Sequence, residues 1–203
     1  MCCRYYTDLS PELRPYVEAA KASRLGRIMI EKLGKPLVTE GEVFPTNMVP
    51  VIATDKNGRQ QVFPMVWGFN ITGLNKPVVN ARVETAYEKK SFKEAWYKRR
   101  CIIPASWYYE WDHRETISKY SIQPSGSSVT YLAGIYQIQE YRNLKYPVFA
   151  VLTREPAGEL KKIHDRMPLI FRSESINDWI DPDKKPEDLL DMAVTDLIAE
   201  KCV

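Results

Sequence analysis

The order of apolar and polar positions predicts a helix at the start of the chain and a β-hairpin after it. Ser10-Pro11-Glu12 has the form of a helix N-cap followed by proline at the first helical position. Helix formers dominate from there until Gly34-Lys35-Pro36, so we expect a helical segment over residues 11–33. Two apolar runs joined by turn residues then predict a hairpin, with the first run, the turn and the second run at 43–51, 55–58 and 60–69.

Short strands dominate the pattern after this hairpin. Ser91-Phe92-Lys93-Glu94 fits a capping box, which predicts a short helix over 92–98. Runs rich in aromatic and β-branched residues follow and predict strands at 101–103, 107–111, 116–122, 130–137 and 146–152. The turns between them are too short for helical crossovers, so we expect a mostly antiparallel sheet system. Helices are expected at 156–163, 173–179 and in the tail after Pro186.

Composition and charge limit what the chain can be. It has 203 residues, 44% of them hydrophobic, and no repeat or linker, so one α+β domain over residues 1–203 is the simplest organisation. No apolar stretch approaches 18 residues and no leader is evident, so we expect a cytoplasmic protein with no membrane span. The net charge of +3 is mild, and any nucleic-acid contact must come from a local patch.

Metal and disulfide chemistry are not favoured by the cysteine pattern. The four cysteines include no C-x-x-C pair, and His113 and His164 are the two histidines. This is poor zinc spacing and an unconvincing disulfide framework for a chain of this length. We therefore expect reduced thiols, no metal and no cofactor.

The sequence Met1-Cys2-Cys3-Arg4 offers unusual chemistry. If Met1 is trimmed, Cys2 carries a free α-amine beside its own thiol. An aldehyde condenses with such an amine, and the thiol then closes a five-membered thiazolidine ring. An α-amine is about one-tenth neutral at pH 7, whereas a lysine amine is neutral about 0.04% of the time, so the terminus is the better nucleophile. On these four residues alone, an accidental cysteine on a frayed terminus is the alternative.

Three further stretches place polar residues where burial or a cleft is expected. Asn80, Arg82 and Glu84 recur at strand period directly after an apolar run, although a solvated strand face has the same pattern. Glu110 lies among four aromatic residues, where enclosure would make it a proton donor and acceptor; an edge-strand glutamate facing water is the alternative. His164 follows a predicted helix, where it is either an imidazolium favoured by the helix dipole or an ordinary C-cap.

Together these stretches resemble the SRAP (SOS response-associated peptidase) family, the covalent sensors of abasic sites in DNA. The resemblance runs over nearly the whole chain. Its marks are Met1-Cys2-x-Arg4, Pro45-Thr46, Val49-Pro50-Val51, Trp67-Gly68, Asn80-Ala81-Arg82-x-Glu84-Thr85, Ser91-Phe92, Arg99-Arg100-Cys101-Ile102-Ile103-Pro104-Ala105, Tyr109-Glu110-Trp111 and His164-Asp165-Arg166-Met167-Pro168. It implies a barrel-like β core with peripheral helices.

The resemblance also implies a reaction and the residues that perform it. The amine of Cys2 would add to the aldehyde of an abasic deoxyribose, and its thiol would close a thiazolidine that shields the lesion. Asn80 would position the terminus and the sugar, Glu110 would move protons, and His164 would assist sugar ring opening and crosslink reversal. The chain would then be a crosslinking enzyme of DNA repair with peptidase and lyase-type chemistry, the peptidase step being removal of Met1. Ordinary aminopeptidase trimming would also suffice.

A set of DNA contacts follows from the same resemblance. Arg4, Arg82 and Arg166 would hold phosphates, and Trp67 and Trp111 would stack on bases unless they are core residues. The other matched DNA-binding positions are Pro45, Lys93 and Thr153. The expected partner is single-stranded DNA that contains abasic sites, bound by a monomer that is nucleoid-associated in a bacterium.

Departures from the family pattern put the groove next to the lesion in doubt. Cys3 and Trp107 stand where family members usually have glycine, Lys93 stands where arginine is common, and the usual Thr-x-x-Ala-Asn run is altered after Thr153. Two other functions remain open. One is an N-terminal-nucleophile peptidase or amidohydrolase with Asn80 as oxyanion donor. The other is a non-covalent single-stranded DNA-binding module.

Overall fold

A computed structural model describes residues 2–114 and 116–202, and its N-terminal third contains two helices where the sequence predicts one. The predicted helical segment is divided into α1 (Arg14–Ala22) and α2 (Arg24–Leu33). Ser23 separates them, because its extended backbone ends α1 while its hydroxyl accepts a hydrogen bond from Gly26 N at 2.9 Å and caps α2. Gly34 ends α2 in the left-handed conformation, with φ of 65°, as the sequence predicts.

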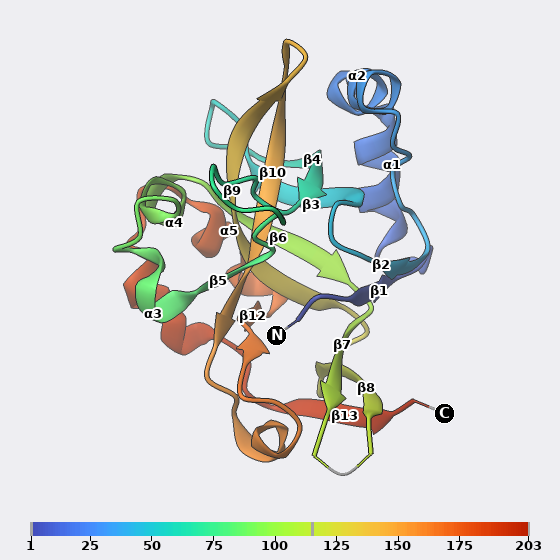
Figure 1. Cartoon of the computed structure of the whole chain (residues 1–203), viewed down its shortest axis with the longest axis vertical. Coiled ribbons are helices and arrows are strands. Elements are labelled where there is room, and N and C mark those ends of the chain that lie inside the picture. The colour runs from blue at the N-terminus through green and yellow to red at the C-terminus, as the bar shows by residue number, and fades with distance from the viewer. Residues whose placement is uncertain (1, 115, 203) are drawn as a thin grey trace.

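Five strands close into a barrel at the centre of the molecule (Figure 1). They are β3 (Met48–Thr54), β4 (Gln60–Trp67), β6 (Arg100–Ala105), β9 (Thr130–Tyr141) and β10 (Leu144–Arg154). The sheet closes because β10 pairs both with β9, antiparallel, and with β4, parallel. The other neighbours are antiparallel, so the predicted α+β class with a mostly antiparallel, barrel-like core and peripheral helices is confirmed.

Alternating side chains give the barrel two apolar faces. Along β3, Val49 and Val51 belong to one buried cluster, and Met48 and Ile52 belong to a second. The second cluster includes residues of α1, α4 and α5, so it is the outer layer between the barrel and its helices. Cys2 belongs to the first cluster, together with interior residues of the barrel strands. The N-terminus is therefore packed as part of the core.

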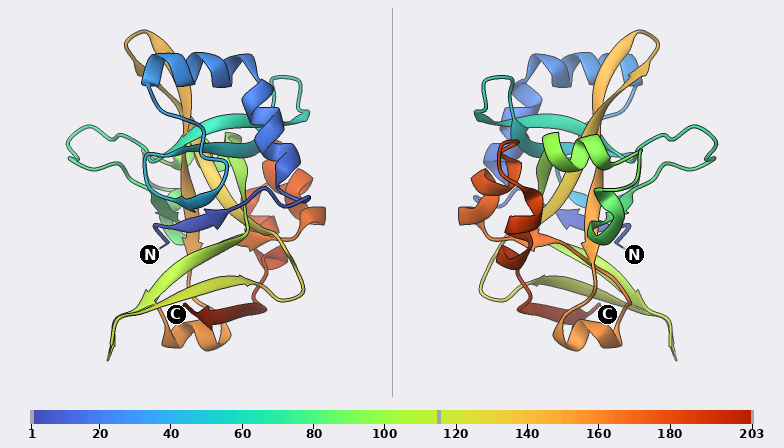
Figure 2. Two further views of the ribbon diagram at one scale, coloured as in Figure 1. Left: turned by 90° about the vertical axis from the view of Figure 1, so that its right-hand side faces the viewer. Right: turned by 90° about the vertical axis from the view of Figure 1, so that its left-hand side faces the viewer.

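A second sheet extends from the end of the barrel (Figure 2). Its order is β13 (Leu197–Lys201), β8 (Ser118–Pro124), β7 (Trp107–Asp112), β1 (Tyr5–Thr7) and β2 (Gly41–Val43). Ser106 alone separates β6 from β7, so one continuous stretch of chain passes from the barrel into this sheet. Because β1 pairs with both β2 and β7, the segment directly after Cys2 is a central strand.

The remaining elements border the barrel. Short strands join it at β5 (Asn80–Arg82), β11 (Met167–Pro168) and β12 (Ile170–Phe171). The short α-helices are α3 (Val83–Ala86), α4 (Lys93–Lys98) and α5 (Ile176–Ile180), and the 3-10 helices are η1 (Gly158–Lys162), η2 (Ser173–Ser175) and η3 (Pro186–Met192). Among the described residues, no helix is long and apolar enough to cross a membrane.

Four local predictions are wrong. Glu84 does not continue the strand of Asn80 and Arg82, because α3 begins at Val83. Ser91 makes no capping hydrogen bond to α4, whose N-cap position is Phe92. The predicted helix over 156–163 is only a 3-10 helix at η1, and the tail after Pro186 ends in a strand, β13. In the tail, the antiparallel pairing of β13 with β8 overrides the local helical signal.

Buried Arg100 ties the barrel to the segment that follows α5. Its guanidinium donates hydrogen bonds to five backbone carbonyls, those of Trp179 (2.6 Å), Trp96 (3.1 Å), Tyr97 (2.9 Å), Lys184 (2.9 Å) and Asp181. Burial lowers the pKa of Arg100 to about 10, so the group remains charged at neutral pH.

Replacing Arg100 with methionine should strongly destabilise the fold. The Arg100→Met change leaves these carbonyls without their donor, and we expect the free energy of unfolding to fall by about 3 kcal/mol. Urea denaturation measures this. Lys98→Met is the matched control, since Lys98 is exposed and gives one hydrogen bond to Pro182 O; it should change stability by at most about 0.5 kcal/mol. Equal stabilities of the two variants would contradict the assigned role.

Candidate functional site

Cys2 is held in a buried position by the strand that follows it and by Asn80. Its side chain is 1% exposed. The amide Nδ2 of Asn80 donates a hydrogen bond to the carbonyl oxygen of Cys2 at 2.8 Å, and the Cys2 thiol lies 3.9 Å from the carbonyl oxygen of Arg4. Asn80 begins β5, which pairs with β10 of the barrel, so the amide is fixed to the barrel wall. Met1 lies outside the described residues.

The environment of the Cys2 thiol disfavours its ionised form. Burial raises the pKa of this thiol well above its ordinary value, and the Glu110 carboxylate raises it further. Burial also raises the pKa values of the Tyr5 and Tyr108 hydroxyls, to which the charge of Cys2 contributes. Cys2 is therefore a neutral thiol at pH 7, and any reaction at sulfur needs a base to take its proton.

Glu110 and His164 form a pair across the site. Glu110 is 3% exposed on β7, and its Oε1 lies 3.1 Å from Nε2 of His164. At the other ring nitrogen, Nδ1 accepts a hydrogen bond from Arg166 N at 3.0 Å and lies 2.7 Å from Oδ1 of Asp165. A neutral ring accepts from the Arg166 N–H, whereas a protonated ring donates to Asp165. In both states the Nε2 proton faces Glu110, so a proton can pass between them.

The structure separates two roles of His164 that the sequence leaves as alternatives. Its backbone N donates to Leu160 O at 3.0 Å, as expected of a residue that follows a short helix. Its ring points instead to Glu110. Since η1 is a single short 3-10 helix, the contact with Glu110 and not a helix dipole decides the ring's environment.

Arg166 is committed to an internal ion pair. Its two terminal nitrogens donate to the carboxylate of Glu84 at 3.0 and 2.7 Å, and one of them also donates to the carbonyl of Thr153 at 2.7 Å. Burial alone would raise the pKa of Glu84, but the hydrogen bonds from Arg166, a backbone hydrogen bond and the charges of Arg166 and Arg82 together hold that pKa below its ordinary value. Arg166 thus orders the end of β10 next to Arg82, which is exposed.

Arg4 lies between aromatic rings beside the site. Its guanidinium carbon is 4.5 Å from the ring centre of Phe44 and 5.0 Å from that of Trp111. Its Nη1 pairs with Glu42 at 3.2 Å. Trp111, predicted to stack on bases, is partly exposed on β7.

Two residues predicted to contact DNA are fully buried in the structure. Trp67 is 0% exposed, its Nε1 donates to Val79 O at 3.0 Å, and it stacks on Phe149, so it is a core residue with no face open to a base. Thr153 is also 0% exposed. Pro45 is partly exposed in the turn before β3, and Lys93 is exposed on α4.

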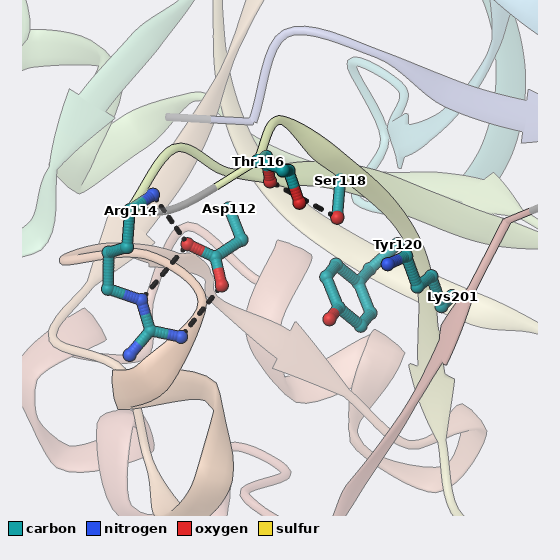
Figure 3. Close-up of a pocket in the computed structure, with 6 residues that line it drawn as sticks. All are labelled: Asp112, Arg114, Thr116, Ser118, Tyr120 and Lys201. Atoms are coloured by element: carbon teal, nitrogen blue, oxygen red, sulfur yellow. Dashed lines mark hydrogen bonds and ion pairs between the residues drawn. The ribbon is translucent and has the colours of Figure 1, made fainter.

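An open hollow of about 620 Å³ lies next to Asn80 and Arg82. Its walls come from the segment after β4 and the segment before α4, and its lining includes Lys89 and Lys90. A separate hollow of about 360 Å³ lies at the far end of the β7–β8 hairpin, where Asp112 pairs with Arg114 (Figure 3). It contains none of the predicted site residues. Among the described residues, no three His, Cys, Asp or Glu side chains are grouped to hold a metal ion.

The sequence does not identify the ion-pair partners of the charged residues around the site. The pairing of Glu84 with Arg166 joins positions 82 residues apart, and that of Lys119 with Glu42 joins positions 77 apart. A charge on a strand, such as Glu42 or Lys119, can signal a partner, but it does not identify that partner.

Comparisons with known proteins point to one family. Residues 1–201 match the family described as SOS response associated peptidase (SRAP). The Bacillus subtilis abasic site processing protein YoaM is 34% identical over 56% of this chain and 51% of its own length. The B. subtilis abasic site processing protein YobE is 30% identical over 74% of this chain and 75% of its own length. A crystal structure of a Bacteroides thetaiotaomicron protein shares the fold, with a TM-score of 0.77, 20% identity, and coverage of 100% of this chain and 92% of that one.

Proposed function

The chain belongs to the SOS response associated peptidase (SRAP) family, and from this we propose that it processes abasic sites in single-stranded DNA by trapping them covalently on Cys2. Relatives named abasic site processing proteins support the choice of lesion. The observation that carries the proposal is the hydrogen bond from Asn80 to the Cys2 carbonyl, which holds the reactive residue beside Glu110 and His164.

The proposed reaction needs the amine of Cys2 to be free, so Met1 is removed first. The amine then adds to the aldehyde carbon of the opened deoxyribose, and the resulting carbinolamine loses water to give an imine. The Cys2 sulfur attacks the imine carbon, the thiol proton leaves, and the imine nitrogen gains a proton. The product is a thiazolidine, and the overall change is the loss of one water molecule.

The neighbouring side chains have distinct tasks in this scheme. Asn80 fixes the terminus through the Cys2 carbonyl, so that amine and thiol face the same point. Glu110 takes the thiol proton, which matters because burial keeps that thiol neutral. His164 exchanges a proton with Glu110 through Nε2 and assists opening of the sugar ring and reversal of the crosslink.

DNA binding is assigned to the exposed cations around this site. Arg82 and Arg4 hold phosphates on either side of the lesion, and the hollow beside Asn80 and Arg82 accepts the flanking nucleotides. Trp111 stacks on a base. Arg166 acts as a positioning residue, because its guanidinium is already bound by Glu84.

Mixing the purified protein with single-stranded DNA that contains one abasic site tests the proposal. We expect a one-to-one adduct that survives boiling in detergent. Intact mass spectrometry should show a protein without Met1 and an adduct that has lost one water. An undamaged oligonucleotide of the same sequence is the control. A complex that dissociates in detergent for both oligonucleotides would contradict covalent trapping and favour the non-covalent binding module.

A peptidase or amidohydrolase is the alternative within enzyme chemistry. It predicts repeated turnover with a released product, and it needs a donor for the oxyanion. Asn80 is the candidate donor, and one of the two N–H groups of its Nδ2 is already used by the Cys2 carbonyl. A strictly stoichiometric reaction would count against this alternative.

Removing the Asn80 side chain, which anchors Cys2, should slow crosslinking without weakening DNA binding. For Asn80→Ala we expect about a tenfold slower crosslinking rate at saturating DNA, the value of one hydrogen bond that orients the reacting group. Single-turnover gel assays give the rate. Asn70→Ala is the matched control, since Asn70 is exposed and bonds through its backbone. A rate for Asn80→Ala equal to that of the control would remove Asn80 from the scheme.

A further inference from the structure

Two cations, Arg4 and Lys119, share the carboxylate of Glu42 on the second sheet, which contains β13, β8, β7, β1 and β2. Glu42, on β2, pairs with Nη1 of Arg4 at 3.2 Å through one oxygen and with Nζ of Lys119 through the other. Lys119 lies on β8 opposite Trp111 of β7. Two strands, β2 and β8, and the segment directly before β1 therefore bring these charges together, and none of the three residues is adjacent to another in sequence.

Aromatic rings hold the two cations in place. Lys119 Nζ lies 3.7 Å from the ring centre of Tyr109, and the Arg4 guanidinium lies over Phe44 and Trp111. The side chains are nevertheless accessible, with exposed fractions of 32% for Arg4 and 27% for Lys119. Fixed orientation with open N–H groups suits recognition of an incoming anion, because little side-chain freedom is lost on binding.

The cluster carries an excess of one positive charge and is linked to the reactive residue. The carbonyl of Arg4 receives the Cys2 thiol contact at 3.9 Å and a hydrogen bond from Tyr109 N at 2.9 Å. An anion bound by the Arg4 side chain would therefore be held by a residue whose backbone contacts the Cys2 thiol and which follows Cys2 by two positions. A phosphate diester offers the charge and the pair of acceptor oxygens that Glu42 now supplies.

We propose that Lys119 is a second phosphate-binding residue beside Arg4, and that Glu42 is an internal competitor that a DNA phosphate displaces. This inference rests on the proposed function, which makes single-stranded DNA the ligand. Glu42 keeps the two cations apart from each other and oriented while the site is empty. It also lowers the affinity for DNA, because its pairing must be broken when phosphate binds.

The salt dependence of binding tests the role of Lys119. Affinity for an undamaged, fluorescently labelled single-stranded oligonucleotide is measured by anisotropy over a series of salt concentrations. We expect Lys119→Gln to weaken binding and to reduce the slope of log K against log salt by about 0.7, the value for one lost phosphate contact. Lys145→Gln is the control, since Lys145 is exposed on β10 near the β9–β10 turn, far from β8 in Figure 1, and it should leave the slope unchanged.

The effect of Glu42→Gln has the opposite sign. Glutamine keeps the shape of the side chain and loses its charge, so we expect DNA to bind up to about fivefold more tightly, the range of a partly exposed ion pair. A purely structural Glu42 predicts a lower melting temperature with equal or weaker binding. A slope for Lys119→Gln equal to that of Lys145→Gln, or no gain in affinity for Glu42→Gln, would overturn the inference.

The two proposals fail in different ways. If the unaltered protein crosslinks abasic DNA but Lys119→Gln keeps the full salt slope, this inference alone is wrong. If the unaltered protein binds DNA with the expected changes in both variants but forms no detergent-stable adduct, the phosphate site stands and covalent trapping is wrong. No binding of DNA by the unaltered protein would overturn both.

Discussion

Cys2→Ala should abolish the detergent-stable adduct with abasic DNA. Alanine keeps the α-amine, so an imine can still form, but it cannot close the thiazolidine ring, and the imine hydrolyses during denaturation. We expect at least a hundredfold less stable adduct in a denaturing gel, on the order of the effect of removing a catalytic nucleophile. Trapping the imine with borohydride should restore a covalent band, which would show that the amine remains active.

Cys3→Ala is the matched control for this experiment. Cys3 is exposed whereas Cys2 is buried, so the neighbouring thiol has a different environment on the same segment. We expect Cys3→Ala to crosslink at a rate within about twofold of the unaltered protein, because a ring closed by the next residue's thiol would be much larger than five members. Loss of the stable adduct in Cys3→Ala but not in Cys2→Ala would mean that Cys3, and not Cys2, carries the chemistry.

Glu110→Gln should slow crosslinking by about a hundredfold or more at pH 7, the lower end of the range for general acid-base catalysis. The pH dependence follows from the Cys2 thiol. Because burial and Glu110 raise the pKa of this thiol, the thiolate is scarce at neutral pH and becomes more abundant as the pH rises. Without a neighbouring base, the rate should rise about tenfold per pH unit below the thiol pKa.

The unaltered protein should depend less on pH over this range, since Glu110 takes the thiol proton directly. Single-turnover rates between pH 6 and 9 compare the two profiles. Glu140→Gln, on the exposed end of β9, is the control for a lost carboxylate and should behave like the unaltered protein. A steep pH profile in the unaltered protein as well would mean that the free thiolate, and not Glu110-assisted thiol, closes the ring.

Local patterns in the sequence predict most of the elements because those patterns reflect short-range constraints. The two apolar runs at 43–51 and 60–69, and the Asp55–Gly58 turn between them, specify the hairpin that the structure contains. The turn at Arg142 and Asn143 is likewise visible, and both residues adopt positive φ in the tight β9–β10 connection. The barrel closure depends instead on parallel pairing of β4 with β10, which no local pattern encodes.

The sequence identifies the reactive side chains of the site, but it does not identify their hydrogen-bonding and charged partners. Cys2, Asn80, Glu110 and His164 are brought together, as expected from the motifs that contain them. The sequence leaves Trp67 as either a base-stacking or a core residue, because it does not reveal that the indole N–H has a partner in Val79. Burial of an aromatic residue depends on neighbours distant in sequence, and a motif shared with a family fixes its identity without fixing its exposure.

Cys2, the proposed reactive residue, shortly precedes β1, a short strand that is hydrogen-bonded to β2 along one edge and to β7 along the other. This arrangement has a practical consequence for producing the protein. An affinity tag or fused partner at the amino end would leave extra peptide on Cys2 and block its amine, however well the rest of the chain folds. A tag at the opposite end would follow β13, the outermost strand of its sheet, and would leave the amine available after processing.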